Sequence, residues 1–277
     1  MYRVSKVLNN NGVIAIDMDE NKEYVILGKG VGFGKKVSQR FDKPEGCTTY
    51  RLEQETERGS AKELVKGIEP EYLEIADAIL TESQKVFGDS IDRGILFPLA
   101  DHISFAVARI RRNEQISNPL TEDIKVLFYS EFKVAETLKT ILRERLQIEI
   151  DDHEVGYVAL HIHSAIGDEK VSVAMQTARA VRECIDMIEK ATGKPIDVLS
   201  LSYNRLMNHM KYMVARASTG EKLNLDMNEY MLDQYPQAYK VVTDICKNLE
   251  GCIGHKLDET ETGYLAMHIQ RVYKDAV

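Results

Sequence analysis

The chain has 277 residues, more than one ordinary hydrophobic core requires, so two or three domains are expected. Apolar residues make up 44%, enough for a core in each domain, and no run approaches the roughly 20 apolar residues that span a membrane. A net charge of −8 argues against non-specific binding of nucleic acid along the whole chain.

The cysteines form no CxxC pair and show no metal-ligand spacing; they are Cys47, Cys184, Cys246 and Cys252. Buried thiols in a reducing cytoplasm are therefore expected, rather than a disulfide framework or a zinc site.

The charge is unevenly distributed along the chain. Residues 1–51 carry nine Lys and Arg against six Asp and Glu, a balance of +3, whereas the remainder carries −11. A slightly basic head on an acidic body would let one small part of the chain meet polyanions.

The head reads as short strands separated by turns. Stretches rich in β-branched residues alternate with Asn-, Asp- and Gly-containing turn signals, which predicts a small antiparallel sheet. The expected strands are Tyr2–Leu8, Val13–Asp17, Glu23–Leu27 and Thr48–Leu52. So small a sheet buries little surface, and a second copy of itself is the simplest partner.

A helical body follows the head. Glu53–Lys66 is polar and predicts a linker, and helical spacing of apolar residues begins at Pro70. The pattern predicts a multidomain chain: a small antiparallel β domain followed by two all-α helical-bundle domains. The expected boundaries are 1–58 for the head, 59–66 for the linker, and 67–171 and 172–277 for the two helical domains.

The body contains an internal repeat. Shifting the chain by 107 residues places Leu99–His163 on Leu206–Gln270 without a gap, with 17 of 65 positions identical. The run Gly156–Ile162 falls on Gly263–Ile269. The two helical domains are therefore predicted to be copies of one unit.

Four of the seven histidines superpose under this shift. His102 falls on His209 and His161 falls on His268. A single histidine on an amphipathic helix is usually a half-buried structural residue, but two retained in register in both copies favour a shared chemical role. Three histidines have no counterpart and are expected to be bystanders: His153, His163 and His255.

Three chemistries suit paired histidines. A metal site needs further ligands, and no cysteine repeats. The matched acidic pairs Asp151/Glu154 and Asp258/Glu261 are interpreted as helix caps. Acid–base catalysis needs a constellation that the sequence does not offer. Reversible phosphorylation remains, because neutral imidazole is a nucleophile at cellular pH. Arg109 and Arg216 lie two helical turns after the first histidine of each copy, where they steady a phosphate or bind a nearby acid.

The chain resembles transcriptional antiterminators of the BglG/SacY/LicT family over its whole length. The resemblance rests on the Asn-rich turn, the Gly-Lys-rich run, and two copies of a GYxAxHI run with an upstream histidine. Within the family, the chain is most similar to the glucose-responsive, GlcT-like branch.

The resemblance implies a CAT RNA-binding domain that dimerises and binds a hairpin in leader mRNA, so that a terminator hairpin cannot form. The implied RNA-binding residues are Lys6, Asn10, Asn11, Gly28, Lys29, Gly30, Phe33 and Lys35. Asparagine reads base edges, phenylalanine stacks on bases and lysine meets phosphates. Judged without the family, the asparagines and glycines are equally well explained as turn residues.

The resemblance also implies two PTS regulation domains (PRDs), whose phosphoacceptors are His102, His161, His209 and His268. The implied donors are the phosphocarrier HPr and a sugar-specific enzyme II of the sugar phosphotransferase system. Phosphate on the first copy would switch the protein off, and phosphate on the second would favour activity. No cofactor, metal or enzymatic turnover is implied. The alternatives are a PRD-containing DNA-binding regulator and a phosphate-accepting module without RNA binding.

Overall fold

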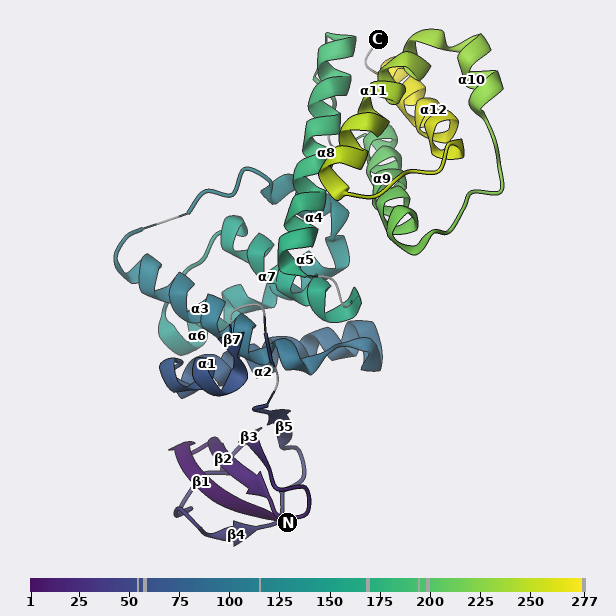
Figure 1. Ribbon diagram of the computed structural model, residues 1–277. Coiled ribbons are helices and arrows are strands. Elements are labelled where there is room, and N and C mark those ends of the chain that lie inside the picture. The colour runs from purple at the N-terminus through teal and green to yellow at the C-terminus, as the bar shows by residue number, and fades with distance from the viewer. Residues whose placement is uncertain are drawn as a thin grey trace. The chain divides into compact units, whose positions relative to one another are not determined.

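The structure is a computed structural model that describes residues 1–53, 55–56, 59–114, 116–167, 170–193, 195–197 and 200–275. A five-stranded antiparallel sheet at the N-terminus precedes a helical body (Figure 1). The predicted fold class is therefore confirmed.

The sheet has the strand order β4-β1-β2-β3-β5. Its strands are β1 (Tyr2–Asn9), β2 (Gly12–Asp17), β3 (Lys22–Leu27), β4 (Arg40–Phe41) and β5 (Thr48–Arg51). Four were predicted from alternation and turn signals. Strand β4 was missed because two residues are too few to show a period.

The core of the head lies on one face of this sheet. Its buried residues are Val4, Val13, Ala15, Ile26, Val31, Phe41 and Cys47, with Tyr2, Val7 and Tyr24 packed against them. Val4, Val13 and Ala15 follow the two-residue period of a strand, so a slip of one residue in β1 or β2 would turn them outward. The period therefore fixes the register of the hairpin.

The described residues of the segment predicted as a linker include regular elements. Strands β6 (Glu55–Thr56) and β7 (Gly59–Ser60) form a ribbon, and helix α1 (Ala61–Gly67) follows directly. Ala61 and Val65 of α1 are buried, so this helix packs by its apolar face. Residues 54, 57 and 58 lie outside the described part of the chain, and the predicted domain boundaries stay a prediction.

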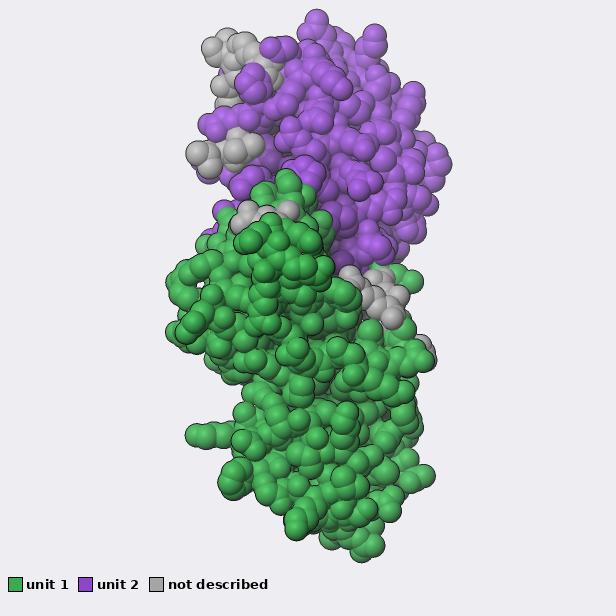
Figure 2. All heavy atoms as spheres, turned by 90° about the vertical axis from the view of Figure 1, so that its left-hand side faces the viewer, with its two compact units in different colours: residues 1–118, 130–170 green, residues 119–129, 171–277 purple. Residues whose placement is uncertain are grey.

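The described chain forms two compact units (Figure 2). The first comprises residues 1–118 and 130–170. Its longer helices are α2 (Pro70–Phe87), α3 (Leu96–Arg111), α6 (Thr137–Leu146) and α7 (Asp152–Gly167). Two 3-10 turns, η1 (Gly88–Ser90) and η2 (Arg93–Ile95), lie between α2 and α3. The short helix α5 (Tyr129–Ala135) precedes α6 and begins at the unit boundary. Helix α3 packs against α2 and α7, which brings the first repeat's two histidine-bearing helices together.

The second unit comprises residues 119–129 and 171–277. Its helices are α4 (Thr121–Leu127), α8 (Val171–Thr192), α9 (Leu201–Thr219), α10 (Asn228–Gln234), α11 (Pro236–Ile253) and α12 (Thr260–Asp275). Helix α12 packs against α9, as α7 packs against α3 in the other copy.

Helix α4 belongs to the second compact unit although its sequence lies in the first repeat. It packs against α8 and α9, and its Ile124 and Leu127 are buried there. The repeat alone gives no sign of this assignment, because the contact is made with residues far along the chain.

Among the described residues, none of the helices is both long and apolar enough to cross a bilayer.

The glycine loop between β3 and β4 gives a prediction about packing. A Cβ atom at Gly32 would lie 2.0 Å from the carbonyl oxygen of Asn9, whereas one at Gly67 would meet nothing within 4 Å. Gly32→Ala is expected to destabilise the head by roughly 1–3 kcal/mol, because backbone must move to admit the methyl group. Gly67→Ala is the matched control and should be close to neutral.

Hydrogen exchange of the β1 and β2 amides in the full chain measures this locally. Equal protection in the two variants would contradict the packing described for this loop.

Candidate RNA interface and paired-histidine sites

The Asn-rich turn and the glycine loop of the head lie against one another. The N–H groups of Gly28 and Gly32 donate to the carbonyls of Asn11 and Asn10, at 2.9 and 3.0 Å. The N–H of Gly30 donates to Oδ1 of Asn11 at 3.0 Å. Two segments of the predicted RNA-binding set, about 20 residues apart in sequence, therefore form one surface.

The side chains around this surface are exposed. Phe33 is 74% exposed, so its ring face is open to a stacking partner. The ammonium group of Lys35 lies 4.9 Å from the ring centroid of Phe41, and Lys6 and Lys29 are exposed. The surface thus offers a stacking ring and cations together.

The asparagine amides are engaged in the first unit. Nδ2 of Asn9 donates to Oε1 of Glu74 at 2.7 Å, and Nδ2 of Asn11 donates to Oε2 at 3.2 Å. A carboxylate of helix α2 thus binds two amide donors of the Asn-rich turn.

The first repeat brings its two histidines together on α3 and α7. The ring centroids of His102 and His161 are 5.3 Å apart, and Tyr157 lies 5.7 Å from His102. Both histidines are buried, with 8% and 5% of their surface exposed. Residues 59 positions apart in sequence are therefore side by side in the core.

The second repeat builds the same pair on α9 and α12. The rings of His209 and His268 stack with centroids 4.9 Å apart, and Tyr264 lies 4.8 Å from His209. The exposed fractions are again small, 7% and 8%. The register of the repeat is thus reproduced in three dimensions.

A buried glutamate completes each pair. Oε2 of Glu154 lies 3.5 Å from Nε2 of His102, and Oε1 accepts a hydrogen bond of 2.8 Å from Arg109. In the second copy, Glu261 lies 3.5 Å from Nε2 of His209 and binds Arg216 through two hydrogen bonds of 2.6 and 3.0 Å.

The interpretation of these glutamates as helix caps was wrong. In the first copy Asp151 is the cap, since its Oδ1 accepts from the N–H groups of His153 and Glu154 at 3.0 and 3.2 Å. The Glu154 side chain points to Arg109 and His102 instead. The internal repeat could have identified this glutamate, because the shift that superposes the histidines also places Glu154 on Glu261.

Burial controls the charge state of these groups. Desolvation, helped by the positive charge of Arg216, lowers the pKa of His209 to about 3, and desolvation with Arg271 and Arg205 lowers the pKa of His268 to about 4. Burial opposes ionisation of Glu154, but His102 and Arg109 outweigh it and lower the pKa of that carboxyl. Each described cluster thus combines a carboxylate paired with arginine and two imidazoles, and the second-copy imidazoles are neutral at pH 7.

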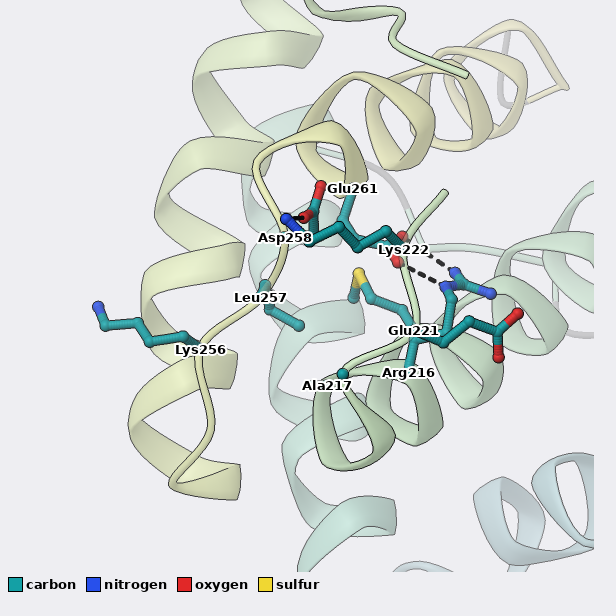
Figure 3. Close-up of a pocket in the computed structure, with 10 residues that line it drawn as sticks. Arg216, Ala217, Glu221, Lys222, Lys256, Leu257, Asp258 and Glu261 are labelled. Carbon is teal, nitrogen blue, oxygen red and sulfur yellow. Dashed lines mark hydrogen bonds and ion pairs between the residues drawn. The ribbon is translucent and has the colours of Figure 1, made fainter. Parts of the chain in front are cut away.

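A pocket in the second unit reaches one end of its cluster (Figure 3). Arg216 and Glu261 both line it, together with Lys222 and Asp258, which form an ion pair at 3.2 Å. The side chain of Arg216 is 15% exposed and that of His209 is 5% exposed. The arginine end of the cluster therefore meets solvent while the imidazole end is closed.

The other histidines lie outside the pairs. Nδ1 of His163 is 2.9 Å from Glu131, an arrangement that the second copy lacks because Gln270 and Ala238 occupy the matching positions. His153 is half-buried in the first turn of α7, and His255 is exposed.

Within the described ranges, no group of three or more His, Cys, Asp or Glu side chains has an arrangement that would hold a metal ion.

Two protein families match the chain. The CAT RNA binding domain matches residues 2–59, and the PRD domain matches residues 77–165 and 182–272.

Relatives match over nearly the whole chain. The GlcA/glcB genes antiterminator of Staphylococcus carnosus is 30% identical over 97% of this chain and 94% of its own length. The transcription antiterminator LicT of Bacillus subtilis is 27% identical over 99% of this chain and 100% of its own length. A solved structure, the crystal structure of GlcT CAT-PRDI, is 29% identical with a TM-score of 0.52, covering 60% of this chain and 98% of that one. The chain therefore belongs to the family of transcription antiterminators in which a CAT RNA-binding domain precedes two PRD domains.

Proposed function

We propose that the protein binds a leader-mRNA hairpin as a homodimer, prevents terminator formation, and is controlled by phosphate on His102, His161, His209 and His268. The observation that carries the proposal is the duplicated cluster: the same His–His–Glu–Arg arrangement is built twice behind an RNA-binding head. In this role the chain receives phosphate and regulates transcription, with no turnover of its own, in the cytoplasm.

The head supplies the chemistry for RNA. Asn10 and Asn11 offer groups for base edges, the backbone of Gly28 and Gly30 admits close approach, and Phe33 offers a stacking face. Lys6, Lys29 and Lys35 supply cations for phosphates. RNA that uses the Asn11 amide must replace the carboxylate of Glu74.

The paired histidines supply the chemistry for phosphate. An imidazole that is neutral at pH 7 keeps the lone pair that attacks phosphorus. We propose HPr and a sugar-specific enzyme II as donors, since phosphohistidine on a carrier exchanges readily with another histidine. Arg109 and Arg216 are held beside the acceptors by Glu154 and Glu261, ready to turn toward a phosphate.

Burial turns phosphorylation into a conformational signal. A phosphoryl group carries a charge of about −1.5 to −2, and each pair is closed and lies beside a buried glutamate. The packing of α3 on α7, or of α9 on α12, must change to admit it. We propose that this change alters dimer contacts. Phosphate on the first copy then switches the protein off, and phosphate on the second copy favours activity.

The RNA proposal predicts a loss of affinity in Phe33→Ala. Removing a stacking ring should weaken binding of the leader hairpin by about 1–3 kcal/mol, which is roughly 5- to 150-fold in Kd. Val37→Ala is the matched control, because Val37 is also exposed (64%) and apolar but has no ring. Calorimetric titration of the full chain measures the affinity of both variants. The proposal would be overturned if Phe33→Ala bound the hairpin as tightly as the unmodified chain does, or if the unmodified chain bound a scrambled hairpin equally well.

The phosphate proposal predicts where the label appears. Phosphorylation by the carrier system, followed by mass spectrometry under non-acidic conditions, should find phosphate on His102, His161, His209 and His268 only. The bystanders His153, His163 and His255 are internal controls in the same digest. Phosphate mainly on His153 or His255 would refute the assignment from the repeat.

The neutral imidazoles of the second copy predict that the free energy of unfolding depends on pH. Because the folded-state pKa values of His209 and His268 (about 3 and about 4) lie below the unfolded value of about 6.5, the unfolded state binds more protons. Stability is then lost as the pH falls below about 6.5, by up to about 1.4 kcal/mol per pH unit for each ring.

Urea unfolding at pH 7, 6 and 5 measures this slope, and His268→Gln should reduce it. Nuclear magnetic resonance of the imidazole nitrogens gives the direct check. Protonation of His209 near pH 6.5 in the folded chain would contradict the burial described for it.

A further inference from the structure

The first histidine of each copy has one ring nitrogen buried against a carboxylate. Nε2 of His102 and Nε2 of His209 are both buried without a hydrogen-bond partner, and each faces a glutamate carboxylate at 3.5 Å. The matched geometry in two independently packed copies makes it a property of the site. A ring nitrogen that holds its proton toward a carboxylate has no lone pair with which to attack phosphorus.

The carboxylate also selects the tautomer of the ring. A neutral imidazole carries its proton on one nitrogen and a lone pair on the other. With an ionised glutamate facing Nε2, the tautomer with the proton on Nε2 is favoured, because a lone pair there would point at a negative charge. Carboxylates orient catalytic and metal-binding imidazoles in the same way.

The arginine fixes the carboxylate in this orientation. Glu154 uses Oε1 for Arg109, which leaves Oε2 toward His102, and Glu261 likewise bridges Arg216 and His209. The side chains of Glu154 and Glu261 are 5% and 2% exposed, so water does not screen the interaction.

We infer that Glu154 and Glu261 are positioning residues which hold the proton on Nε2, so that His102 and His209 accept the phosphoryl group on Nδ1. The inference rests on the proposed phosphorylation and adds the acceptor atom and the residues that select it. The second ring of the second pair shows the opposite arrangement, because Nδ1 of His268 is the buried nitrogen without a partner.

The transfer step balances without a further reagent. The Nδ1 lone pair of His102 forms the new N–P bond while the N–P bond of the donor phosphohistidine breaks. The electron pair of the broken bond returns to the donor ring, which enters as an N-phosphoryl imidazolium and leaves as neutral imidazole. The acceptor ring takes over the positive charge, and its Nε2–H faces Glu154, which stabilises that charge as it develops.

The first experiment determines the tautomer in the unmodified full chain. With histidine side chains labelled with ¹⁵N, two-bond couplings distinguish a protonated from an unprotonated ring nitrogen. His102 and His209 are expected to carry the proton on Nε2. A proton on Nδ1 in these two residues would overturn the inference whether or not the protein is ever phosphorylated.

The second experiment identifies the phosphohistidine isomer. A chain carrying His161→Gln, His209→Gln and His268→Gln is phosphorylated with the general histidine phosphocarrier, or with phosphoramidate as a small donor, and digested in alkali. His102 is expected to give the Nδ1 isomer, and the Nε2 isomer would overturn the inference. Transfer from phosphoramidate to Nδ1, with none from the carrier and none from the sugar-specific enzyme II used in its place, would refute the proposed function and support the inference.

The third experiment tests the positioning role. Glu154→Gln should slow phosphorylation of His102 by about tenfold and yield a mixture of isomers, since an amide does not select one tautomer. His209 in the same variant is the control and should be unaffected, and Glu261→Gln should give the reverse pattern. A single Nδ1 isomer formed at the unmodified rate in Glu154→Gln would show that the carboxylate has no such role.

Discussion

The buried glutamate that bridges an arginine and a histidine is the interaction on which each regulatory domain depends. A carboxylate removed from water is costly unless it is paired, so Glu154 requires Arg109 and Glu261 requires Arg216. These ion pairs tie the N-terminal turn of α7 to α3 and that of α12 to α9. The histidines of each pair lie between the same two helices, so anything that disturbs them also acts on the ion pair.

This arrangement explains how a small modification reaches the packing of a domain. A phosphoryl group competes with glutamate for the arginine, and it carries more charge. If the arginine turns to the phosphate, the glutamate is left buried and unpaired, which costs several kcal/mol. Movement of the helix that carries the glutamate then relieves this cost, and a dimer contact with two states can shift with the helix.

Much of the molecule was predictable from the sequence because its signals are local or repeated. Alternation gave β1, β2, β3 and β5, and the 107-residue register gave the two histidine pairs before any geometry was known. The roles of Glu154 and Glu261 were missed because an acidic residue in the first turn of a helix also fits a cap. The cap expected at Asp151 is confirmed, whereas the Glu154 side chain points inward to Arg109 and His102.

Other features of the fold could not be predicted from the sequence because they depend on tertiary contacts. The segment 59–66 is polar enough to suggest a linker, but Ala61 and Val65 give α1 an apolar face that is buried. Helix α4 belongs by sequence to the first repeat, and its assignment to the second unit follows from packing with α8 and α9. The surface formed by the Asn-rich turn and the glycine loop likewise arises from backbone hydrogen bonds between them.

Phosphate that enters a closed histidine pair is expected to loosen the helices that hold the pair. Hydrogen exchange of α3 and α7, compared between the unmodified chain and the chain phosphorylated on His102, measures this most directly. Faster exchange in the first turns of α7, with α9 and α12 unchanged, is the expected result. Stoichiometric phosphate on His102 with unchanged exchange in both α3 and α7 would contradict it.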